Sequence, residues 1–257
     1  MFSKLRSLIF KVDPEKAHTL AIKSLKFNLV PNVFDENKND PIFQTKIFEK
    51  DLDNPIGMAA GFDKNAEVYN SLFKLGFGFV EVGTITPLKQ YGNPKPRVFR
   101  LVEDEALINR LGFNNHGAEI VKDRIRRNKK LGLLGINIGP NKDSSDRLND
   151  YLIGLKTFYD DADYITINIS SPNTENLRTF HEGNKLQDLL KSIMIEKKNL
   201  KSNIPITVKV SPDISEDQVN QISEILSEHE VKAIIVSNTS EATRDKLGNI
   251  QRHQKGG

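Results

Sequence analysis

The sequence has no cysteine among its 257 residues. This absence excludes a disulfide framework, thiolate zinc sites, iron–sulfur clusters and a cysteine nucleophile. The sequence also lacks any apolar run that approaches the ~20 residues needed to span a bilayer. Residues 1–12 are basic and partly apolar, but no small-residue cleavage site follows them, so no secretory signal is predicted. We therefore expect a protein that faces the cytoplasm.

Strong net charge is missing as well. Lys and Arg number 37 against 34 for Asp and Glu, which gives a formal net charge of +3. This balance is too mild to indicate a nucleic-acid partner. The length is enough for one large α/β domain with a small additional element.

Six strand-like runs alternate with amphipathic stretches. The runs are mostly apolar and are predicted to be apolar on both faces, as parallel strands between helices are. Strands are predicted at residues 55–60, 78–83, 133–139, 163–170, 204–210 and 232–237. Helices are predicted near residues 65–75, 116–127, 146–159, 184–199 and 215–228, the last with Ser215 as its N-cap.

This alternation predicts an α/β protein, either a (β/α)8 TIM barrel or an open doubly wound sheet. The barrel is favoured because polar residues follow the C-terminal end of every strand, whereas an open sheet gathers them at one switch point. The count stops at about six β/α units, so we expect a barrel truncated at its C-terminus. We expect residues 41–257 to form this barrel and residues 1–40 a separate helical element.

Two short helices are predicted within residues 3–30. The second begins with Asp13 as N-cap and Pro14 at the first helical position. Each helix has an apolar face flanked by Lys and Arg, which fits either a pair packed on the barrel or an element lying on anionic lipid. A hairpin over residues 46–55, with its turn at residues 51–54, is predicted to close the bottom of the barrel.

The most informative stretch is residues 165–174. Alternating β-branched and short side chains indicate a strand, and Pro172 ends it. Asn168, Ser171 and Asn173 therefore lie at the C-terminal tip of a strand, where α/β enzymes have their active sites.

Two lysines complete the candidate site. Lys64 follows the first strand, and Lys209 lies inside an apolar strand. A buried Lys needs an anion beside it, either a bound ligand or a neighbouring Asp. Carboxamides recognise the donors and acceptors of a neutral amide ring. The candidate site has no cluster of His and carboxylate residues, so a metal is not expected.

These residues resemble the dihydroorotate dehydrogenases of the membrane-associated, quinone-reducing class. The matching segments are residues 13–18, 54–64, 81–87, 96–101, 108–115, 135–139, 168–174, 208–209 and 238–239. The resemblance implies a (β/α)8 barrel that uses FMN to oxidise (S)-dihydroorotate to orotate in pyrimidine biosynthesis. It also implies a membrane quinone as electron acceptor, and a peripheral location at the cytoplasmic side of the cell inner membrane.

The resemblance implies a role for each site residue. Ser171 is the expected catalytic base that takes the C5 proton, while hydride passes from C6 to the flavin. Other enzymes of the family use Cys at this position, and the absence of Cys excludes their class. The expected substrate-binding residues are Lys64, Asn109, Arg110, Leu111, Gly112, Phe113, Asn168, Asn173, Asn238 and Thr239. The expected FMN-binding residues are Ala60, Gly61, Phe62, Asp63, Lys64, Thr84, Asn137, Asn168, Lys209 and Ser237. His18 and Arg100 match residues near the quinone head group, where the N-terminal helices form a hydrophobic mouth.

The sequence departs from the family at two points. Ser237 stands where Thr is common, which keeps the hydroxyl. Barrel enzymes bind the cofactor phosphate with the loops after strands seven and eight, which lie beyond the six predicted units. An inactive fragment of such an enzyme is therefore one alternative. The other is a related flavin barrel that acts on another dihydropyrimidine.

Overall fold

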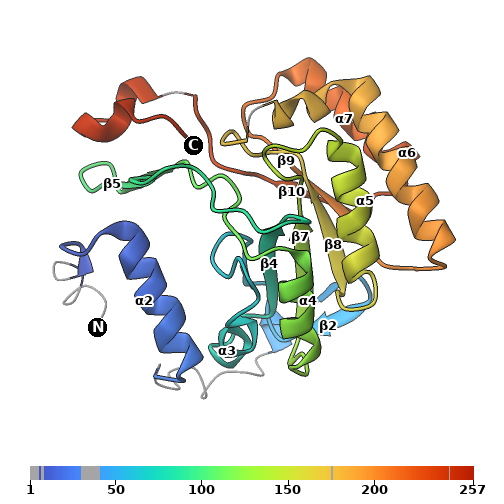
Figure 1. Cartoon of the computed structure of the whole chain (residues 1–257), viewed down its shortest axis with the longest axis horizontal. Helices are drawn as coiled ribbons and strands as arrows, with labels where there is room; N and C mark the ends of the chain where they lie inside the picture. The colour runs from blue at the N-terminus through green and yellow to red at the C-terminus, as the bar shows by residue number, and fades with distance from the viewer. Residues whose placement is uncertain (1–5, 7–8, 30–40, 175, 243) are drawn as a thin grey trace.

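The computed structural model describes residues 6, 9–29, 41–174, 176–242 and 244–257. At its centre lies a sheet of six parallel strands in the order β3-β4-β7-β8-β9-β10 (Figure 1). The strands are β3 (Gly57–Met58), β4 (Phe79–Ile85), β7 (Leu133–Ile138), β8 (Tyr164–Asn168), β9 (Ile206–Val210) and β10 (Ala233–Val236). Within this sheet the strand order follows the chain, whereas a doubly wound sheet reverses its order at a switch point. The predicted partial (β/α) barrel of six units is confirmed.

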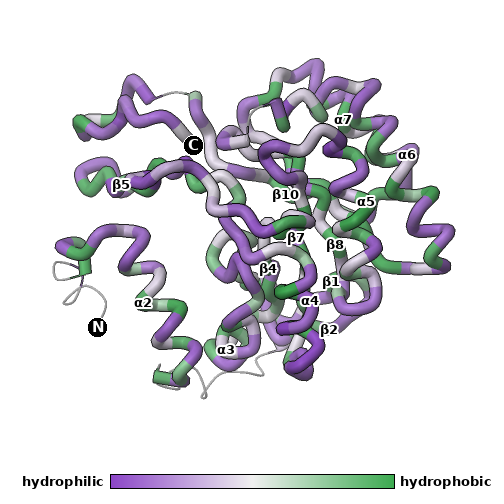
Figure 2. Tube along the Cα trace, in the orientation of Figure 1, coloured by the Kyte–Doolittle hydropathy of each residue, from purple (hydrophilic) through white to green (hydrophobic). Residues whose placement is uncertain are grey.

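The five helices predicted between these strands are present. They are α3 (Tyr69–Lys74), α4 (Ala118–Arg126), α5 (Arg147–Phe158), α6 (Gly183–Asn199) and α7 (Glu216–Glu228). Ser215 caps α7 as expected: its hydroxyl accepts from Gln218 N at 3.3 Å, and its own N–H donates to the Gln218 side chain at 3.0 Å. Along α6, hydrophobic and hydrophilic residues alternate, as they do in a helix with one buried side (Figure 2). The described residues also include four short 3-10 helices: η1 (Pro41–Phe43), η2 (Leu177–His181), η3 (Arg244–Lys246) and η4 (Ile250–His253).

The two faces of the central sheet differ in chemistry. The face under the helices carries the buried side chains of Val82, Ile136, Ile167 and Val208. Burial of such a side chain stabilises the fold by roughly 1.5–3 kcal/mol. The other face carries Glu81, Asn137 and Thr166, which are buried and joined by hydrogen bonds. The prediction of two apolar faces is therefore wrong for this inner face, where hydrogen bonds offset the cost of burying polar groups.

A small hairpin covers the N-terminal end of the sheet. It consists of β1 (Thr45–Ile47) and β2 (Lys50–Leu52), with Thr45 paired to Leu52. Leu52 packs in one buried cluster with Leu133 and Tyr164, the first residues of β7 and β8. The predicted position is confirmed, but the predicted turn at residues 51–54 is wrong. The chain reverses at Phe48 and Glu49, whose φ angles of 51° and 63° suit a tight two-residue turn.

A second hairpin, β5 (Val98–Leu101) and β6 (Ala106–Asn109), stands between α2 (Pro14–Lys26) and the C-terminal residues (Figure 1). Asp13 caps α2 as predicted, accepting from Lys16 N at 2.9 Å. Glu15 of α2 pairs with the buried Arg97 at 2.6 Å, which docks the helix beside β5. The first predicted N-terminal helix lies largely outside the described residues. None of the helices described by the structure is long and apolar enough to cross a membrane.

Candidate active site

A chain of hydrogen bonds connects the C-terminal ends of β4, β7 and β8. Thr84 Oγ1 donates to Asn137 Oδ1 at 2.7 Å. Asn168 Nδ2 donates to Thr84 Oγ1 at 2.8 Å and to Asn137 Oδ1 at 3.1 Å. All three residues are at least nine-tenths buried, so their side-chain orientations are fixed. The structure thus brings together three of the residues predicted to bind FMN.

The chain continues into the loop after β8. Ser170 Oγ donates to Asn168 Oδ1 at 2.6 Å and accepts from Asn238 Nδ2 at 2.9 Å. Ser171 is 4% exposed, and its Oγ accepts from the backbone N–H of Asn173 at 3.2 Å. Asn238 is thereby held near the segment that carries Ser171.

Asn109 faces the same segment from the end of β6. Its Oδ1 accepts from Asn173 Nδ2 at 3.5 Å and from Leu111 N at 3.4 Å. Its Nδ2 and backbone bond Gly257. A Cβ on Gly257 would meet Thr239 Oγ1 at 2.4 Å, so the last residue of the chain lies against Thr239 as well. The structure therefore places Asn109, Asn173 and Thr239, three of the expected substrate-binding residues, around Gly257 and the loop after β8.

The other residues of the 110–113 segment differ in what their side chains do. Arg110 donates to Gln254 Oε1 at 2.9 Å and lies over the ring of Phe99, so its guanidinium is occupied with the C-terminal segment and the β5–β6 hairpin. Gly112 has a φ of 70°, which favours glycine. Phe113 is 9% exposed, and its ring approaches the position a Cβ would take on Gly139.

Neither of the two predicted lysines has an acid partner among the described residues. Lys64 Nζ donates to the backbone oxygen of Gly61, and Lys209 is 8% exposed on β9. Neither forms an ion pair within the part of the chain that the structure describes. Burial lowers the pKa of Lys64 to about 8. Both ammonium groups are thus available to a bound anion.

The turn after β3 has open space at Gly61. Gly61 has a φ of 112°, its N–H donates to Gly83 O at 2.9 Å, and a Cβ would meet nothing within 4 Å. Ala60 is half-buried beside it. Asp63 serves the fold instead: its carboxylate accepts from Glu67 N at 2.8 Å and Val68 N at 2.7 Å. Burial raises the pKa of Asp63.

Comparison with known proteins identifies the family. A family model described as dihydroorotate dehydrogenase matches residues 42–257. The chain is 48% identical over 250 residues to the dihydroorotate dehydrogenase (quinone) of Bartonella tribocorum, covering 95% of this chain and 68% of that protein. It is 44% identical over 262 residues to the protein of the same name from Agrobacterium fabrum, covering 100% of this chain and 72% of that protein. The chain belongs to the dihydroorotate dehydrogenase family.

Solved structures of the family agree in fold. The Eimeria tenella DHODH in complex with ferulenol matches with a TM-score of 0.90 at 35% identity, over 95% of this chain and 72% of that one. The ligand-free form from the same organism matches with a TM-score of 0.89, also at 35% identity, over 95% of this chain and 74% of that one.

His18 lies on α2, and Arg100 lies on β5, the strand that contacts this helix. The His18 ring meets the ring of Phe62 edge-on, with centroids 5.2 Å apart. Burial, together with the charge of Lys64, lowers the pKa of His18. Arg100 donates to Val12 O at 2.7 Å, and its guanidinium lies 4.9 Å from the ring centroid of Phe10. Ser237, after β10, donates its hydroxyl to Asn238 O at 2.9 Å.

Sequence reasoning missed Glu81. This residue is 3% exposed, and its two oxygens accept from Asn137 Nδ2 and Thr166 Oγ1, each at 2.8 Å. Glu81 therefore fixes the amide of Asn137 at the base of the site. The signal was its position two residues before Gly83 in an otherwise apolar strand, which places both residues on one face.

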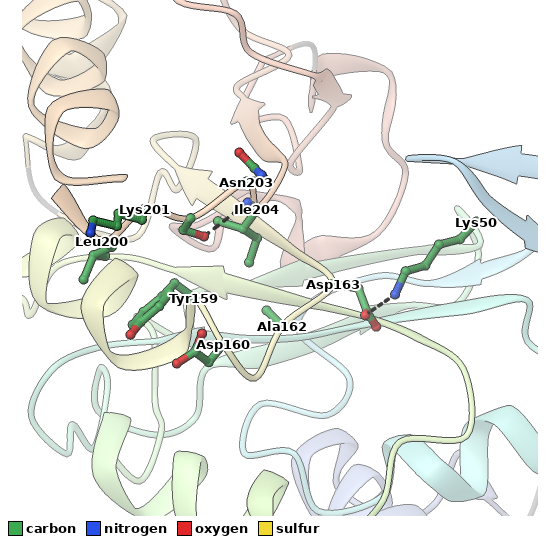
Figure 3. Close-up of a pocket in the computed structure, with 10 residues that line it drawn as sticks. Lys50, Tyr159, Asp160, Ala162, Asp163, Leu200, Lys201, Asn203 and Ile204 are labelled. Atoms are coloured by element: carbon green, nitrogen blue, oxygen red, sulfur yellow. Dashed lines mark hydrogen bonds and ion pairs between the residues drawn. The ribbon is translucent and has the colours of Figure 1, made fainter. Parts of the chain in front are cut away.

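A surface hollow of about 410 Å³ lies at the opposite, N-terminal end of the sheet (Figure 3). It is lined by Lys50, Tyr159, Asp160, Ala162, Asp163, Leu200, Lys201, Ser202, Asn203 and Ile204. None of the predicted site residues lines it. In (β/α) barrels this end serves stability rather than catalysis. Among residues 6, 9–29, 41–174, 176–242 and 244–257, no group of three His, Cys, Asp or Glu could hold a metal ion.

Proposed function

We propose that this protein oxidises (S)-dihydroorotate to orotate in pyrimidine biosynthesis, with FMN as cofactor and a membrane quinone as acceptor. One observation carries the proposal: a buried serine and a ring of carboxamides lie at the strand ends with two lysines that have no acid partner in the described chain. A neutral amide ring with an attached carboxylate complements this set of groups. The family membership supports the same reaction.

The substrate is held by the groups around Ser171. The carboxamides of Asn109, Asn173 and Asn238, with the hydroxyl of Thr239, bond the ring amides. Lys64 meets the substrate carboxylate, since its ammonium forms no ion pair with any described residue. Asn168 and the backbone of residues 110–113 complete this shell.

The residues of this chain fit a flavin. Open space at Gly61, where a Cβ would touch nothing, admits a flat ring against the backbone. Lys209, buried without an acid partner in the described residues, supplies a cation for an electron-rich ring. Thr84, Asn137, Asn168 and Ser237 would hold the ring by hydrogen bonds. Ala60, Phe62, Asp63 and Lys64 shape the turn around it. When bound, the flavin accepts the hydride that leaves C6 of the substrate.

Ser171 takes the C5 proton. A serine hydroxyl is a weak base while it keeps its own proton. As that proton leaves, negative charge develops on Oγ and needs stabilisation. The N–H of Asn173, 3.2 Å away, supplies it. Burial of Ser171 keeps bulk water from the reacting carbon. As Oγ takes the C5 proton, it gives up its own hydroxyl proton. The Thr174 hydroxyl is buried and has no partner among the described residues, so it can relay that proton by accepting it while it donates its own to a water that leads to solvent.

The N-terminal element, residues 1–40, brings quinone to the flavin from the membrane surface. Leu20, Phe27 and Leu29 on and after α2 are 57%, 72% and 70% exposed. Basic side chains such as Lys23 and Lys26 accompany them, as in helices that lie on anionic lipid. His18 on this helix and Arg100 on β5 approach the quinone head group. The protein is thus peripheral, at the cytoplasmic side of the inner membrane.

The test uses the complete gene product that carries this sequence. It should be yellow as purified, and anaerobic dihydroorotate should bleach the flavin absorbance, whereas dihydrouracil and dihydrouridine should not. Bleaching by another dihydropyrimidine in preference would assign the barrel to that substrate. Absence of flavin after reconstitution with FMN would identify an inactive protein.

A second arm tests the membrane acceptor. Replacing Leu20 and Phe27 by Ser should abolish binding to vesicles of anionic lipid and slow reoxidation by a long-chain quinone. Reoxidation by a small soluble acceptor should change little. The control is Glu119→Gln, at an exposed position of α4, which should leave vesicle binding and both reoxidation rates unchanged. An unchanged long-chain quinone rate would contradict the membrane role.

A further inference from the structure

Arg178, in η2, connects the loops that follow three successive strands. Its Nε donates to the backbone oxygen of Ser170 at 3.3 Å, in the loop after β8. Its Nη1 lies 3.2 Å from Asp213 Oδ2, after β9, and 3.3 Å from Glu241 Oε2, after β10. One guanidinium thus spans three segments that are far apart along the chain.

Each of these segments carries or supports a residue of the proposed site. The Ser170 carbonyl belongs to the peptide that leads directly into Ser171, so a donor on this oxygen orients that peptide. Asp213 accepts from the Ser240 hydroxyl and, at 2.9 Å, from the backbone N–H of Glu241. Those residues follow Asn238 and Thr239 immediately. Arg178 therefore reaches both sides of the substrate shell without belonging to it.

The Arg178–Asp213 pair is partly withdrawn from water. The side chains are 26% and 16% exposed. Burial tends to raise the pKa of Asp213, but hydrogen bonds from Glu241 N and Ser240 and the charge of Arg178 outweigh it and lower the pKa. An ion pair with several additional hydrogen bonds holds its geometry better than a solvated surface pair.

A buried histidine reinforces the same connection. His181 Nδ1 is 2.9 Å from Arg178 O, and its Nε2 accepts from the N–H of Ser211 at 3.2 Å. These two bonds join η2 to the end of β9 through a single neutral tautomer. The backbone of η2 is thus anchored independently, and the Arg178 side chain is left to set the loops above it.

We propose that Arg178, paired with Asp213, is a positioning residue that clamps the loops after β8, β9 and β10 in the arrangement that binds substrate. This role rests on the proposed function. It predicts that loss of the guanidinium loosens the loops and misplaces Ser171 and Asn238, while the flavin residues of β4 and β7 keep their places.

The test compares Arg178→Gln, Arg178→Lys, Asp213→Asn and the Arg178→Gln/Asp213→Asn double variant in the complete gene product. A matched control exists in the same chain: Arg126 bonds Asp161 at 2.9 and 3.0 Å at the N-terminal end of the barrel. Arg126→Gln removes an equivalent pair from a place where no substrate residue lies.

The first readout, backbone hydrogen exchange, needs no cofactor. Arg178→Gln should speed exchange at least ~10-fold in peptides covering residues 170–174 and 238–242, but not in β4 or β7. Exchange in these peptides at the parent rate would overturn the clamp. If Arg178→Gln does not fold, Arg178→Lys decides, because it keeps the charge and loses the forked geometry.

The second readout separates positioning from folding. Arg178→Gln should weaken orotate binding and slow flavin reduction by ~10-fold each, with FMN content unchanged. The double variant should lose less than the sum of the two single losses, because Arg178→Gln and Asp213→Asn remove one shared contact. Faster exchange with unchanged orotate affinity and reduction rate would overturn the positioning role. A parent protein that binds neither FMN nor orotate would refute the proposed function instead, and the exchange experiment would still test the clamp.

Discussion

Among the described residues, charged side chains are paired at the N-terminal end of the central sheet, but two lysines are unpaired at its C-terminal end. At the N-terminal end, Asp163 accepts from Leu134 N at 2.7 Å and pairs with Lys50 and with Lys130 at 3.1 Å. At the C-terminal end, Lys64 and Lys209 have no acid partner in the described chain. Folding alone would favour pairing or exposing these lysines. This difference supports the proposed function, in which a bound ligand supplies the missing negative charge at the C-terminal end.

Substitution at the reacting end should affect rate far more than stability. Ser171→Ala removes the only hydroxyl that we place at the proton to be transferred, so flavin reduction by dihydroorotate should slow at least ~100-fold. Stopped-flow absorbance measures this rate, and FMN content should stay the same. Ser223→Ala, on the exposed side of α7, should react at the parent rate. Rapid reduction by Ser171→Ala would remove the serine from the mechanism.

Substitution of the second unpaired lysine should affect cofactor binding. Lys209→Met should weaken FMN affinity by ~10–100-fold, because the electron-rich polar edge of the flavin ring loses the cation that faces it. The cofactor-free protein should not lose stability, since an unpaired buried charge costs free energy in the fold. Fluorescence titration and denaturant unfolding measure the two effects, with Lys198→Met on α6 as control. Earlier unfolding with unchanged FMN affinity would mean that Lys209 has a structural partner.

The opposite pattern is expected at the N-terminal end. Asp163→Asn should lower the free energy of unfolding at pH 7 by ~1–2 kcal/mol and leave FMN binding and flavin reduction unchanged. Burial tends to raise the pKa of Asp163, but the Leu134 N–H and the two lysines outweigh it and lower the pKa. The folded pKa thus lies below the unfolded one, so the stabilisation is present above ~pH 4 and is lost as pH falls through the folded pKa.

Urea unfolding at several pH values measures this difference. The parent and Asp163→Asn should converge in stability below pH 4. A constant difference between them at every pH would show that the carboxylate charge is not what stabilises this end.

The sequence alone was sufficient for the elements whose signal is local. Ser215 and Asp13 predict helix starts because a capping side chain accepts a hydrogen bond from a backbone N–H three residues away. The turn at Phe48 and Glu49 was missed because neither residue type favours a positive φ, and the nearby Asp and Asn residues gave a stronger turn signal. Local patterns thus located the strands and helices but misplaced a turn held by packing on Leu133 and Tyr164.

Glu81 was missed for a different reason. A lone acid in an apolar strand is informative only when its cross-strand neighbours are known, and Asn137 and Thr166 lie 56 and 85 positions away. The same holds for Arg178, whose partners come from the loops that follow three strands. The position of single residues at strand ends could be predicted from the sequence. The contacts that orient them depend on which strands and loops pack side by side in the folded chain.

The mildest expected effect is a pH dependence at Lys64. Burial lowers the pKa of Lys64 to about 8, with the charge of Arg97 acting in the same direction and Glu15 against it. Only the protonated ammonium attracts a substrate carboxylate. Orotate affinity should therefore fall by about tenfold between pH 7 and pH 9, as the protonated fraction falls from roughly nine-tenths to one-tenth.

The stability of the free protein should rise between pH 8 and 10.5, whereas the orotate affinity falls as pH rises. The folded pKa of Lys64 lies below the unfolded value near 10.5, so the unfolded chain binds more protons between pH 8 and 10.5. Lys64 thus makes the free protein more stable as pH rises through that window. Lys64→Arg keeps its charge throughout and should abolish both trends, although its larger side chain lowers the affinity at pH 7. Orotate titrations at pH 7, 8 and 9 decide the matter. An equal decline in the parent and in Lys64→Arg would assign the pH dependence to another group and leave the unpaired Lys64 without its proposed partner.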